Sequence, residues 1–112
     1  MSNHGIQITS SIVTKRSDGK WILNHPFAQS GGALFVVKAK WCGYCHKLDA
    51  EIKKAFEFNK FKYFYLDEAG NQSLLEKMNV SGFPTMFYVQ QGGVLSPYRG
   101  DRSAIELAKN FK

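Results

Sequence analysis

The stretch AKWCGYCHKL, residues 39–48, contains both cysteines of the chain, Cys42 and Cys45, with two residues between them. The run that precedes the pair, ALFVVKA at residues 33–39, is almost continuously apolar, which is typical of a central strand buried on both faces. After the pair, apolar residues recur at helical spacing to about Phe58, and charged residues fill the opposite face. The sequence therefore predicts that the two cysteines lie where a buried strand passes into an amphipathic helix.

Three kinds of chemistry use two cysteines at this spacing. A closed zinc site needs four ligands, but the chain adds only three histidines: His4, His25 and His46. Because His46 directly adjoins Cys45, we expect no metal site. A disulfide that closes so short a loop adds little stability and would be reduced in a reducing compartment. Reversible dithiol–disulfide exchange therefore fits the pair best.

The predicted position of Cys42 suits such exchange. A cysteine at the start of a helix faces unpaired backbone N–H groups and the positive end of the helix dipole, which favour the thiolate and lower the thiol pKa below its free value of ~8.5. Cys45, one turn further along, is expected to be shielded, to keep a higher pKa and to act as the resolving thiol. Three neighbours can add positive potential and tune the pKa: Lys40, His46 and Lys47.

Size and charge narrow the class of protein. The 112 residues suit one domain, residues 1–112. No apolar run reaches the ~18 residues of a membrane span, and the N-terminal segment lacks the ~7–15 apolar residues of a secretory signal. We therefore expect a cytoplasmic protein without membrane binding. The net charge of +6 is spread along the chain and no nucleic-acid motif occurs, so we expect some preference for acidic partners and no nucleic-acid binding. We also expect a monomer.

The pattern of apolar residues also predicts the remaining elements. Strands are expected over residues 6–14, 21–23, 60–67, 85–90 and 93–100, helices over residues 71–80 and from Ser103 onward, and a helical turn from Pro26. The helix between residues 33–39 and 60–67 acts as a crossover, which favours a parallel pair, whereas the last two strands form an antiparallel hairpin. The expected fold is α/β, with a mixed central β-sheet flanked by α-helices on both faces.

A second motif, VSGFPT at residues 80–85, lies between a predicted helix and a predicted strand. Pro84 has no backbone N–H, so it suits the start or the edge of a strand. The local sequence fits both an ordinary loop proline and a cis proline.

Together, WCGYC at residues 41–45 and VSGFPT resemble the thioredoxin superfamily, and WCGYCHKL with GFPT is most similar to its protein disulfide isomerase branch. The resemblance runs from about residue 33 to the C-terminus, including Gly100 and Ser103 around the start of the last helix. It implies a four- or five-stranded mixed sheet flanked by helices. It also implies attack by Cys42 and resolution by Cys45.

The resemblance further implies that Pro84 is cis and lies against the cysteine pair, while the backbone of Phe83 pairs with an extended substrate. Five residues are accordingly expected to bind and position substrate: Trp41, Gly43, Tyr44, Phe83 and Pro84.

Three positions depart from the family pattern, and at one of them Ala50 replaces the helix proline expected five residues after Cys45. The buried acid that the family carries six positions before the first cysteine is replaced by Val36, and the lysine that often pairs with it is replaced by Tyr63. Losing both together avoids an unpaired buried charge. In the family this acid is thought to help deprotonate the resolving cysteine, and two local residues, His46 and Tyr44, are possible substitutes.

The sequence thus predicts a thiol–disulfide oxidoreductase that reduces or exchanges disulfides in protein substrates. Its redox-active pair needs no cofactor, and an unidentified reductase or glutathione would supply electrons. Two alternatives stay open. One is a glutaredoxin-like enzyme that uses glutathione, suggested by Tyr44 before Cys45. The other is a thioredoxin-fold binding module with little redox activity, suggested by the missing buried acid.

Overall fold

The computed structural model describes residues 5–112, so His4 lies outside the described residues. Seven strands form one sheet: β1 (Ile6–Ile8), β2 (Val13–Lys15), β3 (Trp21–Leu23), β4 (Ala33–Lys38), β5 (Tyr63–Asp67), β6 (Thr85–Gln90) and β7 (Val94–Pro97). Their order across the sheet is β1-β5-β4-β6-β7-β3-β2. The pairs β1–β5 and β4–β5 are parallel and the others are antiparallel, so the sheet is mixed, as predicted.

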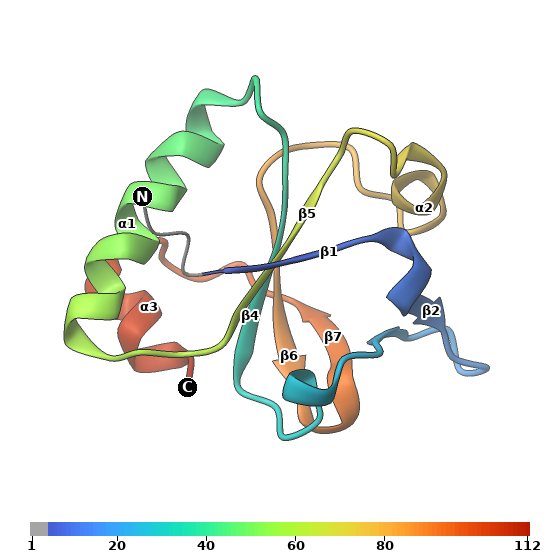
Figure 1. Ribbon diagram of the computed structural model, residues 1–112, viewed down its shortest axis with the longest axis horizontal. Helices are drawn as coiled ribbons and strands as arrows, with labels where there is room; N and C mark the ends of the chain where they lie inside the picture. The colour runs from blue at the N-terminus through green and yellow to red at the C-terminus, as the bar shows by residue number, and fades with distance from the viewer. Residues whose placement is uncertain (1–4) are drawn as a thin grey trace.

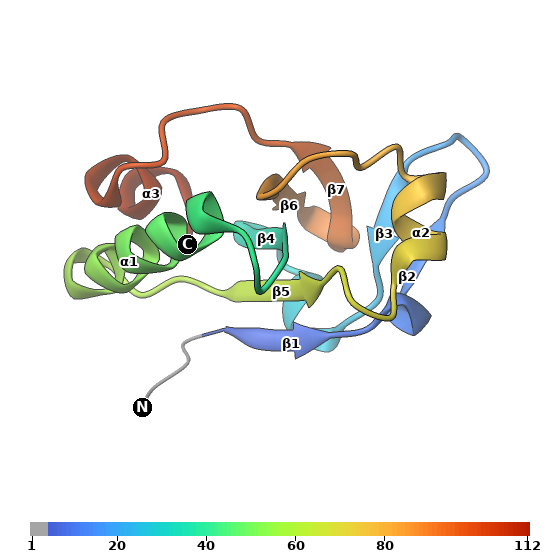
Figure 2. The ribbon, with the colours of Figure 1, turned by 90° about the horizontal axis from the view of Figure 1, so that it is seen from above.

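Helices cover both faces of this sheet, which confirms the predicted architecture. The α-helices are α1 (Gly43–Phe58), α2 (Gln72–Lys77) and α3 (Ala104–Asn110), and three 3₁₀ turns are η1 (Ser10–Ile12), η2 (Pro26–Ala28) and η3 (Gln91–Gly93). Helices α1 and α3 lie side by side in both views and pack on one face, whereas α2 lies away from them and packs on the other (Figures 1 and 2).

Strand β4 forms the centre of the core, and residues 33–37 are all 0% exposed. Their side chains alternate: Leu34 and Val36 pack under α1 and α3, and the residues on either side of them pack on the opposite face. Each large apolar side chain buried in this way contributes about 1.5–3 kcal/mol. As predicted, α1 is the crossover from β4 to its parallel neighbour β5, and β6 and β7 form an antiparallel hairpin.

The expectation of one strand over residues 6–14 is wrong. The backbone N–H of Ser10 donates to the side-chain oxygen of Asn71 at 3.0 Å instead of to a neighbouring strand. The chain therefore turns through η1, and its two halves join opposite edges of the sheet, β1 beside β5 and β2 beside β3. These additions explain why the sheet has seven strands rather than the four or five that the resemblance implied.

Several boundaries also differ from the predicted ones. The helix expected over residues 71–80 ends at Lys77, because Asn79 takes a left-handed conformation with φ of 60° that closes the turn. The strand expected over residues 60–67 begins at Tyr63, and the one expected over residues 93–100 ends at Pro97, where the chain leaves the sheet towards α3.

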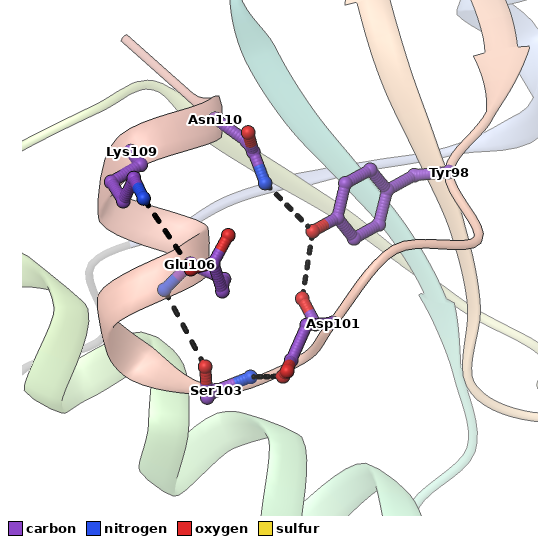
Figure 3. A network of polar contacts seen from close by, with 6 residues as sticks. All are labelled: Tyr98, Asp101, Ser103, Glu106, Lys109 and Asn110. Carbon is purple, nitrogen blue, oxygen red and sulfur yellow. Dashed lines mark hydrogen bonds and ion pairs between the residues drawn. The ribbon is translucent and has the colours of Figure 1, made fainter.

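The start of α3 is held by a network of polar contacts (Figure 3). The hydroxyl of Ser103 accepts from the N–H of Glu106 at 3.5 Å, and the N–H of Ser103 donates to the carboxylate of Asp101 at 2.7 Å. The hydroxyl of Tyr98 donates to the carbonyl of Asp101 at 2.7 Å and accepts from the side chain of Asn110. Thus Asp101, rather than the side chain of Glu106, completes the cap of α3.

Candidate active site

Cys42 lies at the N-terminus of α1, as predicted, and is its N-cap residue. Its sulfur accepts a hydrogen bond from the N–H of Cys45 at 3.1 Å, and its carbonyl accepts from the N–H of His46 at 3.2 Å. One of the unpaired N–H groups of the first helical turn therefore points at the sulfur. The positive end of the helix dipole lies at the same place.

Both cysteines are free thiols in the structure and both are buried, with Cys42 5% exposed and Cys45 2% exposed. By contrast, the side chains of Trp41 and Tyr44 are 71% and 68% exposed. The site therefore presents two aromatic side chains to solvent beside a recessed pair of sulfurs.

The loop before β6 packs directly against the cysteines. The thiol of Cys42 donates to the carbonyl oxygen of Phe83 at 3.5 Å, and the Phe83–Pro84 peptide bond is cis. The rings of Trp41 and Phe83 meet edge to face with their centres 5.6 Å apart. The hydroxyl of Thr85 donates to the carbonyl of Gly82 at 2.6 Å and holds the loop closed.

The pairing of β4 with β6 explains why these two motifs meet. Val37, near the end of β4, stands opposite Thr85, the first residue of β6. Because the strands are antiparallel, the end of one and the beginning of the other lie at the same edge of the sheet (Figure 1). The loop after β4 and the loop before β6 are therefore neighbours.

Cys45 differs from Cys42 in its surroundings. Burial raises the pKa of its thiol to about 11, and its contact with Cys42 and the nearby charge of Asp49 add to the rise. Cys45 is therefore a protonated thiol at neutral pH.

The three residues expected to tune the cysteine pKa lie in different places. The Nε2 of His46 donates to the carbonyl of Lys40 at 2.9 Å, and both residues line a pocket that also reaches Cys45. The ammonium of Lys47 instead lies 5.5 Å from the centre of the Tyr44 ring. The structure thus brings His46 and Lys40 together beside Cys45 and directs Lys47 to the exposed aromatic side chain.

An acid–base pair that was not predicted from the sequence lies in the same pocket. The pocket has a volume of about 260 Å³ and is lined by Cys45, Asp49 and Lys38 among others. The Nζ of Lys38 lies 3.1 Å from the carboxylate of Asp49. The spacing of four residues between Cys45 and Asp49, which places both on one side of a helix, was the signal that could have found Asp49.

The two positions that lack the charged residues of the family, Val36 and Tyr63, are both buried. Val36 is 0% exposed and Tyr63 is 4% exposed, and both pack in the core beneath α1. The hydroxyl of Tyr63 has no hydrogen-bond partner among residues 5–112, and burial raises its pKa far above the usual value. Val36 has no titratable group, and the raised pKa of Tyr63 keeps its phenol protonated at neutral pH.

A second hollow, of about 330 Å³, lies beside the cis proline. It is lined by Pro84 and by the exposed side chains of Arg99 and Arg102. Neither guanidinium forms an ion pair with another residue in the described part of the chain.

Within residues 5–112 no helix has the length and apolar character needed to cross a membrane. The same residues contain no cluster of three or more His, Cys, Asp and Glu side chains arranged to hold a metal ion.

Comparison with known proteins agrees with this geometry. Protein disulfide isomerase-like 2-2 of Oryza sativa subsp. japonica is 38% identical over 87 residues, which cover 72% of this chain and 23% of that protein. The probable protein disulfide-isomerase ER-60 of Schistosoma mansoni is 32% identical over 81 residues, which cover 68% of this chain and 17% of that protein. The chain thus spans less than a quarter of the length of these curated relatives.

Solved structures show the same fold at lower identity. Chloroplastic thioredoxin z superposes with a TM-score of 0.67 at 19% identity, over 97% of this chain and 92% of that one. Human ERp44 form I superposes with a TM-score of 0.70 at 18% identity, over 97% of this chain and 29% of that one. The thioredoxin family itself matches residues 24–112, which include both motifs of the site. The chain therefore belongs to the thioredoxin family.

Proposed function

We propose that this protein is a thiol–disulfide oxidoreductase that acts on disulfides in protein substrates through Cys42 and Cys45. The observation that carries the proposal is the sulfur of Cys42 at the N-terminus of α1, which accepts the N–H of Cys45 and lies against the loop that contains the cis proline. The similarity to protein disulfide isomerases over most of this chain supports it.

The reaction has two exchange steps. The Cys42 thiolate attacks one sulfur of a substrate disulfide, the substrate S–S bond breaks, and the departing sulfur takes up a proton. Cys45 then loses its proton and attacks the Cys42 sulfur, which breaks the mixed disulfide and releases the second substrate thiol. Two electrons pass to the substrate and the enzyme is left with a Cys42–Cys45 disulfide. A reductase that we do not identify, or glutathione, returns the pair to the dithiol.

The surface around Cys42 supports an extended protein substrate. Trp41 and Tyr44 offer exposed aromatic faces on one side, and the cis proline loop with Phe83 and Pro84 borders the other. Gly43 is the first residue of α1, and a Cβ added to it would meet no atom within 4 Å. We therefore propose that this open, partly apolar surface binds the segment of substrate that contains the disulfide, with the protein acting as a monomer.

We propose the reductase direction, and with it a reducing compartment such as the cytoplasm. The test is the reduction potential of the Cys42–Cys45 pair, measured by equilibration in defined thiol buffers followed by trapping with an alkylating agent, together with reduction of insulin disulfides. A potential near about −270 mV with insulin reduction is expected for a reductase. A potential near about −180 mV would instead indicate an oxidant or isomerase and contradict the cytoplasmic location. Failure of the pair to form a disulfide at all would overturn the function.

A further inference from the structure

The second exchange step needs a group that removes the proton of Cys45. This thiol is buried, and its pKa of about 11 leaves very little thiolate at neutral pH. Val36 of β4, at the position where the resemblance expects an acid, is apolar and 0% exposed. The step therefore depends on another proton acceptor within reach of Cys45.

Asp49 lies in the right place for this task. It follows Cys45 by four residues on α1, so that the two side chains project from the same side of the helix, and both line the 260 Å³ pocket. The Asp49 side chain is 41% exposed, so its carboxylate has access to solvent while it borders the buried thiol. Its negative charge already acts on Cys45, because it is among the causes of the raised pKa of that thiol.

Lys38 holds this carboxylate from the end of β4. Its Nζ lies 3.1 Å from Asp49 and 4.3 Å from the centre of the Tyr65 ring, and its side chain is only 18% exposed. A partly buried lysine held between a carboxylate and an aromatic ring has little freedom to move away. The ion pair therefore holds the carboxylate of Asp49 beside the pocket that Cys45 lines.

The other charged and titratable groups around the pocket are less suited. His46 projects from α1, but its Nε2 already donates to the carbonyl of Lys40, and Lys40 itself is a cation. The β5 strand contributes Tyr63, Tyr65 and Asp67 to this side of the molecule. Burial raises the pKa of Tyr63 far above its usual value, so this phenol keeps its proton at neutral pH. Asp67 is the one other carboxylate that lines the pocket, and it comes from a different element than Cys45.

We propose that Asp49, held in place by Lys38, accepts the proton of Cys45 during the resolving step. This inference rests on the proposed function. It assigns the role of proton acceptor to a residue of α1, because β4 has Val36 and not an acid at the position where the resemblance expects one. The carboxylate takes the proton from the Cys45 thiol, either directly or through solvent in the pocket. The resulting thiolate forms the bond to the Cys42 sulfur, and the substrate sulfur that departs takes up a proton. No electrons pass through Asp49.

The test compares Asp49→Asn with Asp49→Glu and two controls, Asp67→Asn and Glu57→Gln. Glu57 is an exposed acid at the far end of α1, so its variant removes the same charge outside the pocket. The rate at which Cys45 resolves a preformed mixed disulfide between Cys42 and a model peptide is measured by rapid quench from pH 5 to pH 10. Thermal unfolding of each variant verifies that it is folded.

Loss of the acceptor is expected to slow resolution at pH 7 by at least about tenfold in Asp49→Asn. Asp49→Glu should restore most of the rate, and both controls should match the wild type. The pKa of Cys45, followed by the thiolate absorbance near 240 nm, should fall in Asp49→Asn because a negative charge is removed. If Asp49 acted only through its negative charge, its removal would make Cys45 more acidic and resolution faster. A slower resolving step together with a lower pKa of Cys45 is therefore specific to the loss of a proton acceptor.

Resolution in Asp49→Asn that is unchanged or faster than in the wild type would overturn the role of Asp49. If Asp67→Asn slowed resolution as much as Asp49→Asn does, the proton acceptor would be Asp67. If Glu57→Gln slowed it equally, the effect would come from the net charge of the protein. Either result would overturn the proposal. These outcomes are distinct from failure of the proposed function, in which wild-type Cys42 would form no mixed disulfide with a disulfide substrate at all.

Discussion

The sulfur of Cys42 lies 3.5 Å from the carbonyl oxygen of Phe83, a residue 41 positions later in the chain. The contact joins the start of α1 to the loop before β6, and the antiparallel pairing of β4 with β6 is what brings these segments together. The proposed nucleophile therefore lies at the border of a surface built by two distant motifs, where an extended substrate segment can reach it.

Replacing each cysteine separately distinguishes their roles. Cys42→Ser is expected to abolish reduction of insulin, because no thiolate remains to attack the substrate. Cys45→Ser should accumulate a covalent complex between Cys42 and the substrate, visible on non-reducing gels and by mass spectrometry. Turnover by Cys45→Ser at the wild-type rate would contradict resolution by Cys45.

The raised pKa of Cys45 predicts how stability depends on pH. Burial raises this pKa from 9.0 to about 11, so between these pH values the unfolded chain loses the proton while the folded chain keeps it. The contribution of Cys45 to the free energy of unfolding of the reduced protein should therefore be fully present below pH ~9 and be lost as the pH rises towards ~11.

This contribution of Cys45 is about 2 kcal/mol. Urea unfolding in reducing buffer at pH 8 and pH 11 measures it when the wild type is compared with Cys45→Ala. The variant should lose less stability than the wild type over this interval. Equal losses in the two proteins would show that the Cys45 thiol does not titrate differently in the folded state.

The turn between β6 and β7 predicts a sharp difference between adjacent glycines. Both Gly92 and Gly93 have positive φ, but a Cβ on Gly93 would collide with the carbonyl oxygen of Leu23, whereas one on Gly92 would meet no atom within 4 Å. Gly93→Ala should therefore lower the free energy of unfolding by more than about 2 kcal/mol, and Gly92→Ala by only about 1 kcal/mol. Chemical denaturation measures both, and equal effects would show that β3 can move away from the turn.

The pair of arginines beside the cis proline predicts substrate preference. Arg99 and Arg102 line the hollow next to Pro84 and form no ion pair with another residue in the stretch 5–112. Changing both to Glu should raise KM for a disulfide peptide with acidic flanking residues by about tenfold at low salt and leave kcat unchanged, because charge attraction between the free partners assists binding. The same change at Lys53 and Lys60, which lie outside this hollow, provides the matched control. A KM that rises equally in both double variants would indicate only an effect of net charge.

Much of the fold follows from local patterns. The apolar run at residues 33–39 identifies β4, because a strand buried on both faces has apolar residues throughout. The helical spacing of apolar residues after Cys45 identifies α1, because a helix buried on one face repeats them every three or four positions. The same spacing places Cys42 at a helix N-terminus. The strand over residues 6–14 could not be resolved in this way, because the break at Ser10 depends on a hydrogen bond to Asn71, which lies 61 positions away.

The sequence by itself identified the groups that carry the proposed chemistry: two cysteines at the end of a buried strand, a proline motif about 40 residues later, and the absence of an acid at Val36. Only the tertiary structure decided which groups surround that chemistry. It placed Phe83 against Cys42 and paired Lys38 with Asp49 beside Cys45. The reason is physical, because periodicity reports which side of an element is buried, whereas the neighbours across that buried side depend on how strands from distant parts of the chain pair.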